Sequence, residues 1–227
     1  MTINEENRFL PGDLIAVGDI HGRYDLLDKL TGVVADSGVH LLFLGDLIDR
    51  AKAPEDDLSV LSTVQWMADR PEDWGLASVG CLRGNHEDML LKALRDQSPW
   101  GSDIDLWRCN GGAIEAIDQL RQFEAWIRSF PLFRKVGSTV FVHGGLEPGV
   151  PLSQQNPDEM VWIRNRFLNA DKLGVRGVKC VVHGHTPNFC GGVVVKHNRI
   201  GLDSGAYFTG KLSCYNHRSG EVFQVTE

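Results

Sequence analysis

The sequence predicts a single α/β domain, and two features of the chain support this prediction. Short apolar runs rich in β-branched residues end abruptly in a glycine and polar residues, which is typical of buried strands that lead into loops. Segments with helical periodicity lie between these runs, and alternating strands and helices are characteristic of α/β proteins. The 227 residues, 42% of them hydrophobic, suffice for one substantial core. We therefore expect residues 1–227 to form one domain.

Five segments are predicted to be strands, because each is short and apolar and each is followed by a polar cluster. They comprise residues 14–17, 41–44, 78–82, 139–142 and 180–182. The ends of such strands commonly carry the sites of α/β proteins, so the five loops that follow are the expected location of function.

Four segments are predicted to be helices, namely residues 24–35, 54–68, 86–94 and 113–128. In the last of them branched apolar residues recur at spacings of three and four residues, at Ile114, Ile117, Leu120 and Ile127. Trp66 and Trp126 fall within these helices and are expected to lie in the core.

Residues 95–110 connect two predicted helices without clear periodicity, and we expect them to form a loop. The loop carries Trp100, Trp107 and three aspartates, and it follows the helix that begins at His86. It is a candidate for selecting the substrate, and a solvated connection without such a role fits its composition equally well.

The chain beyond residue 193 has a different pattern. Short runs at residues 193–195, 211–215 and 222–225 are separated by polar turns, which predicts antiparallel hairpins. Asp203-Ser204-Gly205 is expected to form a turn that can bring Asp203 near the site.

Composition excludes several classes of partner. The net charge of −7 disfavours nucleic acid and anionic membranes, which would repel the chain at long range. No apolar run approaches the roughly 18 residues of a membrane span, and the first ten residues contain no apolar core of a signal peptide.

Five cysteines without a C-x-x-C pair are interpreted as reduced, mostly buried thiols, with Cys81 and Cys180 inside strands. We expect a cytoplasmic monomer.

Potential metal ligands follow every predicted strand, and they combine carboxylate, amide and imidazole groups. They are Asp19 and His21, then Asp46, Asn85 and His143, and finally His183 and His185 on either side of Gly184. A single Asp or His in such a place is usually a turn or core residue, but five coincident strand ends make that explanation improbable. The mixed donor set suits Mn, Fe or Zn better than Ca or Mg, and Asp46 can bridge two ions about 3.5 to 4 Å apart.

In these motifs the chain resembles the metal-dependent phosphoprotein phosphatases of the PPP type, which belong to the calcineurin-like metallophosphoesterase superfamily, and specifically their compact bacterial and phage members. The matching segments are Gly18-Asp19-Ile20-His21-Gly22, Gly45-Asp46-Leu47-Ile48-Asp49-Arg50, Leu82-Arg83-Gly84-Asn85-His86-Glu87, Val142-His143-Gly144-Gly145 and Gly184-His185-Thr186-Pro187. They occur in the family's order across residues 18–187. The resemblance implies a β-sandwich flanked by helices, in four α-β-β-α layers.

The resemblance also implies two divalent ions, for which manganese is our first expectation and iron and zinc are alternatives. Asp19, His21 and Asp46 would bind one ion, and Asp46, Asn85, His143 and His185 would bind the other. Spacing alone does not choose between His183 and His185, and the family's motif favours His185, with His183 as a supporting residue.

Further roles follow from the same resemblance. His86 would be the general acid and Asp49 the residue that orients it. Arg50, Arg83 and Arg164 would hold the phosphate, with Arg166 as a nearby alternative to Arg164 and with Trp162 in the core. The implied mechanism is in-line attack by a hydroxide that bridges the two ions. Where the family usually has glycine after Asp-Arg this chain has Ala51, so we expect a different turn beyond Arg50.

These residues lead to three hypotheses for function. The first is a phosphomonoesterase that acts on phosphoproteins or phosphopeptides, at Ser/Thr by family analogy, with phosphotyrosine and small aryl phosphates also accepted. The second is a hydrolase that cleaves dinucleoside polyphosphates symmetrically. The third is a non-catalytic binding module, which we disfavour because every ligand position, His86 and Asp49 carry chemically competent residues.

Overall fold

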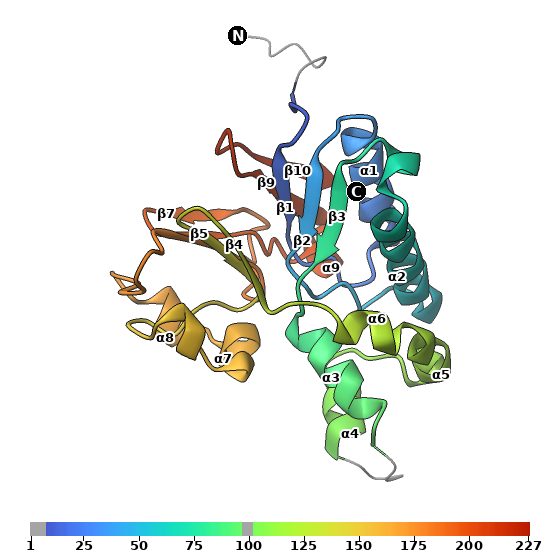
Figure 1. The fold of residues 1–227 in the computed structure, drawn as a ribbon. Coiled ribbons are helices and arrows are strands. Elements are labelled where there is room, and N and C mark those ends of the chain that lie inside the picture. The colour runs from blue at the N-terminus through green and yellow to red at the C-terminus, as the bar shows by residue number, and fades with distance from the viewer. Residues whose placement is uncertain (1–7, 97–101) are drawn as a thin grey trace.

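Two five-stranded sheets dominate the computed structural model, which describes residues 8–96 and 102–227 (Figure 1). Sheet A has the order β10-β9-β1-β2-β3, and sheet B has the order β4-β5-β6-β8-β7. The strands of sheet A are β1 (Leu14–Val17), β2 (His40–Phe43), β3 (Ser78–Cys81), β9 (Lys211–Asn216) and β10 (Val222–Thr226). Those of sheet B are β4 (Phe133–Val136), β5 (Thr139–Val142), β6 (Cys180–His183), β7 (Val194–Lys196) and β8 (Arg199–Gly201).

Each sheet combines three parallel strands with two that pair antiparallel. In sheet A, β1, β2 and β3 run parallel, with Val17 opposite Phe43 and Phe43 opposite Cys81, while β9 and β10 are antiparallel neighbours. In sheet B, β5, β6 and β8 run parallel, and β4 and β7 pair antiparallel at the edges. Parallel strands end at the same edge, so the loops that leave β1, β2 and β3 are brought together.

The helices are mostly short. The longer ones are α1 (Tyr24–Val34), α2 (Pro54–Asp69), α3 (Asn85–Ala93) and α4 (Ser102–Cys109). The shorter ones are α5 (Ile117–Leu120), α6 (Glu124–Arg128), α7 (Pro157–Trp162), α8 (Asn165–Leu168) and α9 (Ala206–Thr209). Single 3₁₀ turns occur at η2 (Pro71–Trp74), η3 (Ile114–Ala116), η4 (Arg121–Phe123) and η5 (Leu152–Gln154).

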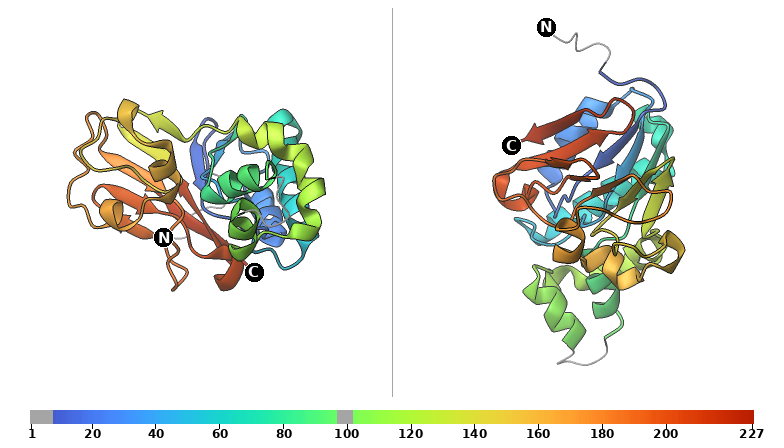
Figure 2. Two further views of the ribbon diagram at one scale, coloured as in Figure 1. Left: turned by 90° about the horizontal axis from the view of Figure 1, so that it is seen from below. Right: turned by 90° about the vertical axis from the view of Figure 1, so that its left-hand side faces the viewer.

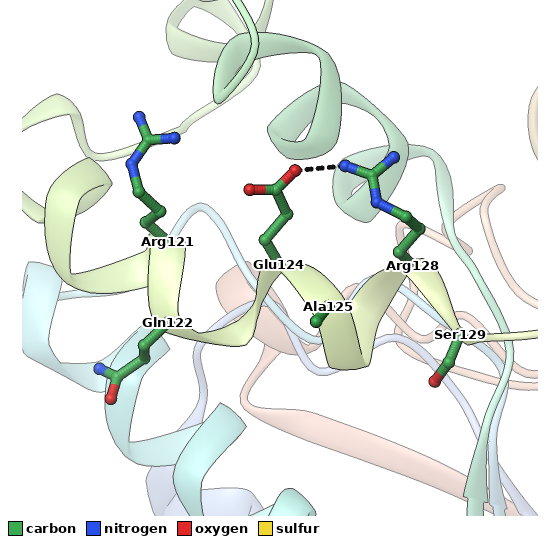
Figure 3. A pocket seen from close by; sticks show the side chains of 6 residues that line it. All are labelled: Arg121, Gln122, Glu124, Ala125, Arg128 and Ser129. Atoms are coloured by element: carbon green, nitrogen blue, oxygen red, sulfur yellow. Dashed lines mark hydrogen bonds and ion pairs between the residues drawn. The ribbon is translucent and has the colours of Figure 1, made fainter.

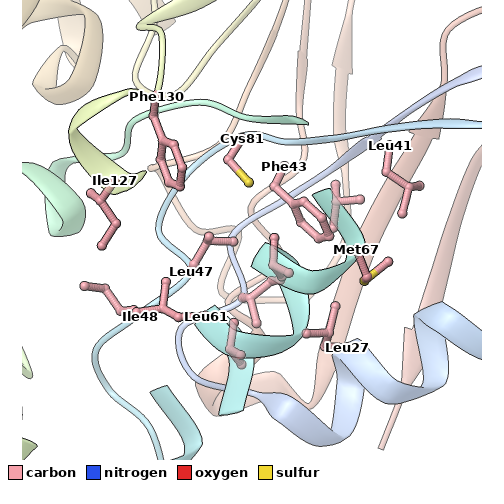
Figure 4. Packing of buried hydrophobic residues seen from close by; sticks show 14 of the residues in the cluster. Leu27, Leu41, Phe43, Leu47, Ile48, Leu61, Met67, Cys81, Ile127 and Phe130 are labelled. Carbon is pink, nitrogen blue, oxygen red and sulfur yellow. The ribbon is translucent and has the colours of Figure 1, made fainter. Parts of the chain in front are cut away.

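The alternation of side chains along the strands explains the layers. In β1, Ile15 and Val17 face α1 and α2 within the largest apolar cluster, part of which is drawn in Figure 4. Leu14 and Ala16 face the other way and meet sheet B. The outer face of sheet B packs against α7 and α8, with Phe167 fully buried there. Figures 1 and 2 show the resulting order of helices, sheet A, sheet B and helices, which confirms the predicted single four-layer α/β domain.

One predicted helix is wrong in form. Residues 113–128 fold as η3, α5, η4 and α6 in succession rather than as one helix. The buried positions in this segment, Ala116, Leu120, Phe123 and Ile127, still recur at spacings of three and four, so the apolar pattern does not reveal where the backbone tightens into 3₁₀ turns. Trp66 was expected in the core, but it is 52% exposed on the outer face of α2.

Other sequence-based expectations also need correction. Residues 102–109 of the predicted loop form α4, whereas Trp100 lies outside the described residues. Strands β4 and β8 were not predicted, because β4 carries exposed charged residues and β8 has only three residues. Cys109 and Cys190 are exposed, so the cysteines are not mostly buried. No helix in the described parts of the chain has the length and apolarity needed to cross a bilayer.

Candidate metal centre

Six predicted ligands converge from five loops of the two sheets. We call Asp19, His21, Asp46, Asn85, His143 and His185 the ligand cluster. Each of these residues is at most 3% exposed. The loops that follow β1, β2 and β3 supply four of them, and the loops that follow β5 and β6 supply His143 and His185. The amide of His185 donates to the Asp19 carboxylate at 2.9 Å, which links the two sheets directly.

Asp46 lies at the centre of the ligand cluster. Its carboxylate oxygens are 3.3 Å from Nε2 of His143 and 3.6 Å from Nε2 of His21. Nε2 of His86 is 3.8 Å away. Two overlapping sets therefore have ligand atoms within 4.8 Å of one another, and both include Asp46: one with His21 and His86, the other with His143 and His185. A shared carboxylate of this kind can bridge two cations.

Two histidines of the ligand cluster present the same ring nitrogen to Asp46. Nδ1 of His21 is 3.0 Å from the Ile48 carbonyl, and Nδ1 of His143 is 3.0 Å from the Leu44 carbonyl. Because a carbonyl only accepts, each Nδ1 carries a proton, and Nε2 is the ring nitrogen that can coordinate a cation when the ring is neutral. Backbone carbonyls commonly orient metal-binding histidines in this way.

The donor set fits divalent cations, and two observations on buried acceptors support this fit. Asp19 Oδ1 is buried without a hydrogen-bond partner. Asn85 Oδ1 lies 2.9 Å from Nε2 of His143, next to Asp46. Buried oxygen and imidazole acceptors that converge in this way suit a divalent transition metal, which can accept their lone pairs. His183 belongs to neither ligand set within the described chain; its ring packs on Phe167 and its Nδ1 faces the Gly184 carbonyl.

The electrostatics of the ligand cluster also indicate excess negative charge. Burial, together with the neighbouring carboxylates of Asp203 and Asp46, raises the pKa of Asp19 well above its ordinary value. Burial alone would lower the pKa of His143, but the charge of Asp46, a hydrogen bond to it and the charge of Asp19 raise that pKa to about 9. A cation bound among these carboxylates would compensate the same negative charge.

Backbone strain is concentrated at the site. Among the described residues other than glycine, six have positive φ, and all except Asp36 are predicted site residues. The five are His21, Asp46, Asp49, Arg50 and His185. Such conformations are unfavourable for residues with a Cβ and persist where surrounding contacts enforce them, commonly at functional sites.

Two glycines allow the loops to approach each other closely. A Cβ on Gly84 would lie 2.2 Å from Asp46 Oδ1, and a Cβ on Gly184 would lie 2.0 Å from Asp19 Oδ1. Any side chain at either position would displace a carboxylate of the ligand cluster.

His86 and Asp49 form a buried pair next to the ligand cluster. Nδ1 of His86 is 2.6 Å from Asp49 Oδ2, and the His86 amide donates to Asp46 Oδ1 at 3.0 Å. Burial raises the pKa of Asp49 well above its ordinary value. Burial, only partly offset by the charge of Asp46, lowers the pKa of His86 to about 4. Negative charge bound beside the ring would favour its protonated form.

Two of the predicted arginines contact the ligand cluster. Nη1 of Arg50 is 2.8 Å from Nε2 of His21, and its guanidinium lies 4.9 Å from the centre of the Tyr207 ring. Nε of Arg164 donates to Nε2 of His185 at 2.9 Å. Arg166, the alternative, instead pairs with Glu147 and Glu159 at the surface.

The third arginine is oriented differently. Nη2 of Arg83 donates to the carbonyls of Arg128 and Phe130 at 2.7 and 3.3 Å, so its guanidinium is anchored at the end of α6. Trp162 is only partly buried, and its ring packs edge-on against His185 at 5.8 Å.

Four further residues support the site and were not assigned a role from the sequence. Glu87 accepts hydrogen bonds from the amides of Asp46, Leu47 and Gly84 at 2.8 to 2.9 Å, and so fixes the loop that carries Asp46. A glutamate three residues after a helix N-cap is a recognisable signal, and it could have identified this residue. Asp203, whose approach to the site was expected, raises the pKa of Asp19 through its charge.

The remaining two supports are Asp57 and Trp107. Asp57 Oδ1 accepts from the Asp49 amide at 2.9 Å, and the Trp107 indole donates to Asp49 Oδ1 at 2.9 Å. Both side chains are fully buried. No local sequence pattern distinguishes them from ordinary helix residues.

Two hollows in the described surface are lined by residues outside the ligand cluster. One of about 530 Å³ is lined by Arg121, Gln122, Glu124, Ala125, Arg128 and Ser129 (Figure 3) and includes no predicted site residue. Another of about 470 Å³ lies over sheet B and includes His183 and Thr186.

Comparisons with known proteins agree on one family. The family profile described as calcineurin-like phosphoesterase matches residues 13–216. No curated protein matches the chain. A solved structure described as a "putative diadenosine tetraphosphatase" is 23% identical, with 96% of each chain covered and a TM-score of 0.69.

Two protein phosphatases share the fold at lower identity. The cold-active protein-tyrosine phosphatase of a psychrophilic Shewanella species is 19% identical, covering 96% of this chain and 82% of the other, with a TM-score of 0.59. A protein serine/threonine phosphatase from Saccharomyces cerevisiae is 16% identical, covering 97% and 82%, with a TM-score of 0.60.

Proposed function

The chain belongs to the calcineurin-like phosphoesterase family, and from this premise we propose that it hydrolyses phosphate monoesters at a dinuclear divalent metal centre, with phosphoproteins as its substrates. One observation carries the proposal. Five buried ligands from both sheets surround the sixth, Asp46, and the buried His86–Asp49 pair lies beside them. Manganese is the proposed metal, with iron and zinc as alternatives.

The ligand cluster would hold the metals as the sequence predicts. Asp19 and His21 would bind one ion, Asn85, His143 and His185 the other, and Asp46 both. Divalent ions bound there would supply Lewis acidity, neutralising the charge on a phosphoryl group and lowering the pKa of a water molecule.

The protein's own groups would position the substrate and protonate its leaving group. Arg50 and Arg164 contact two histidines of the ligand cluster, so their planar forks can reach the oxygens of a phosphate held there. Nε2 of His86 lies 3.8 Å from Asp46 Oδ2, at the edge of the ligand cluster. Protonated His86 can transfer a proton to the leaving oxygen, while Asp49 holds its Nδ1–H.

A second candidate substrate is a dinucleoside polyphosphate, and a row of aromatic rings favours it. Tyr207 packs against His21 at 5.4 Å, Phe208 against Tyr207 at 4.8 Å, and Phe189 against Phe208 at 5.7 Å. Phe189 is 80% exposed, so its ring is free to stack on a base. The structural neighbour described as a diadenosine tetraphosphatase, whose function is itself inferred, also has the higher TM-score.

The test begins with metal-stripped protein and p-nitrophenyl phosphate, with Mn, Zn, Fe, Mg or no metal added. We expect a transition metal to restore hydrolysis and Asp46→Asn to abolish it. Absence of activity with every metal would refute the phosphoesterase proposal and favour a binding module.

Phosphoserine peptide, phosphotyrosine peptide and diadenosine tetraphosphate then separate the two substrate classes. Phe189→Ala should raise KM for the dinucleotide and leave KM for the phosphopeptides unchanged. The control is Val195→Ala on the exposed strand β7, which should leave both KM values unchanged. Preference for the dinucleotide, by kcat/KM, would replace the phosphoprotein proposal. The cytoplasmic location, the monomeric state and the absence of nucleic-acid and membrane partners stay predictions from the sequence.

A further inference from the structure

We propose that Trp107 is a positioning residue, whose indole N–H fixes the carboxylate of Asp49 so that Asp49 presents His86 to the leaving group. The inference rests on the proposed function in one respect, since it takes His86 to be the general acid. It assigns a catalytic purpose to α4, an element outside the motifs that carry the metal ligands.

Three contacts hold Asp49, and each occupies a different atom. Oδ1 accepts from the Trp107 indole at 2.9 Å, and Oδ2 faces His86 Nδ1 at 2.6 Å. The backbone amide donates to Asp57 at 2.9 Å. An indole nitrogen is a donor only, so Trp107 commits Oδ1 to accepting a hydrogen bond and leaves Oδ2 for His86.

Without this donor, Asp49 would have a buried oxygen lacking a partner. The terminal torsion of an aspartate is broad, so the carboxylate could then rotate away from His86. Trp107, Asp49 and His86 are each at most 1% exposed, so water cannot readily replace the lost hydrogen bond.

The chain after α4 holds Trp107 in place and also supports the neighbour of Asp49. A Cβ on Gly112 would lie 2.2 Å from the Trp107 ring, so the backbone packs directly on the indole. The Gly111 carbonyl accepts from the Arg50 amide at 3.0 Å. Asp49 and Arg50 have φ of 70° and 63°, so α4 contacts one of these strained residues through Trp107 and the turn after α4 contacts the other through Gly111.

The competing explanation is that Trp107 serves only to fill the core. Two substitutions separate the explanations, because each keeps one property of the indole. Trp107→Phe retains most of the ring volume and removes the N–H. Trp107→His loses volume, but its five-membered ring overlays the pyrrole part of indole and can keep an N–H at the same position.

The experiment measures kcat and KM on alkyl phosphates and on p-nitrophenyl phosphate, with His86→Asn as the reference and Trp126→Phe as the control. General acid catalysis contributes roughly 10²- to 10⁴-fold, and only poor leaving groups need it. We expect Trp107→Phe to lower kcat on alkyl phosphates by about 10-fold or more, with KM unchanged and p-nitrophenyl phosphate affected less than about 3-fold. We call kcat on alkyl phosphates divided by kcat on p-nitrophenyl phosphate the alkyl-to-aryl ratio. This ratio should stay closer to the wild-type value in Trp107→His than in Trp107→Phe, even if Trp107→His is the less stable protein.

A core-filling role predicts the opposite order, with Trp107→His the worse enzyme and both substrates affected equally. That result, or an unchanged alkyl-to-aryl ratio in Trp107→Phe, would overturn the proposal. If Trp107→Phe does not fold, Trp107→His alone tests the proposal. A folded Trp107→His protein with a strongly reduced alkyl-to-aryl ratio would refute the role of the N–H. Failure of the proposed function has a different signature, in which wild type is inactive or His86→Asn shows no leaving-group preference.

Discussion

At the scale of single residues, the buried acid Asp57 links backbone geometry to pH. One carboxylate oxygen accepts from the Asp49 amide, while the other is buried without a partner. Burial, followed by the negative charge of Asp49, raises the pKa of Asp57 to about 8 from 3.8. The folded protein therefore binds this proton more tightly than the unfolded chain, and the corresponding stability is complete below pH 3.8 and lost as pH rises through about 8.

We expect Asp57→Asn to remove this pH dependence while keeping an oxygen for the Asp49 amide. At about 1.4 kcal/mol per pKa unit, the variant should gain roughly 2 kcal/mol or more over wild type between pH 4 and pH 9. Urea unfolding of metal-free protein across this range measures the difference. A constant difference between the two proteins would show that Asp57 does not titrate with unfolding.

The ligand cluster could be predicted because each ligand directly follows an apolar strand, so its location is encoded locally. The role of Trp107 could not be predicted in this way. Its hydrogen bond to Asp49 joins residues 58 positions apart, and Trp107 lies on a helix without a recognisable motif. The anchoring of Arg83 on α6 was also hidden, since it depends on carbonyls 45 and 47 positions away. Contacts of this kind are decided by packing between elements.

At the scale of elements, the turn between β6 and His185 controls a ligand on the other sheet. A Cβ on Gly184 would meet Asp19 Oδ1 at 2.0 Å. Gly184→Ala should therefore weaken metal binding by about 10-fold or more, as changes around metal ligands commonly do. Isothermal titration with Mn or Zn measures this effect.

The matched control is Gly32→Ala, in the interior of α1, where a Cβ would meet no atom within 4 Å. It should leave metal affinity unchanged and stabilise the fold by about 0.5 to 1 kcal/mol. Equal metal affinity in both variants would contradict the close approach of the two loops.

Apart from β4 and β8, the strands followed from short apolar runs, and α1, α2 and α3 followed from periodicity, with boundaries within about two residues. The form of residues 113–128 did not follow, because their buried residues keep the three- and four-residue spacing of an α-helix although part of the backbone forms 3₁₀ turns. Helix α4 was missed because its buried face contains Trp107 and few other apolar residues. Its contact with α3, rather than its own periodicity, explains its position.

At the scale of the whole molecule, the ligand cluster joins the two sheets. Four ligands follow strands of sheet A, and His143 and His185 follow strands of sheet B. Metal that binds the folded chain at 100 times its Kd should stabilise it by about 2.7 kcal/mol, or about 5 to 10 °C in Tm. Thermal unfolding with chelator and with added metal tests this, and Asp46→Asn should show a smaller shift. An equal shift in both proteins would place the bound metal elsewhere.

The position of β1 between β2 and β9 sets the order in which the site can be completed during synthesis. The strand β1 is synthesised well before its partner β9, which spans residues 211–216, and the Gly18 amide donates to the Ser213 carbonyl just before Asp19. A growing chain therefore carries Asp19 and His21 long before the strand that flanks their loop exists. The ribosome has to pass residue 216 before this side of the ligand cluster can be completed.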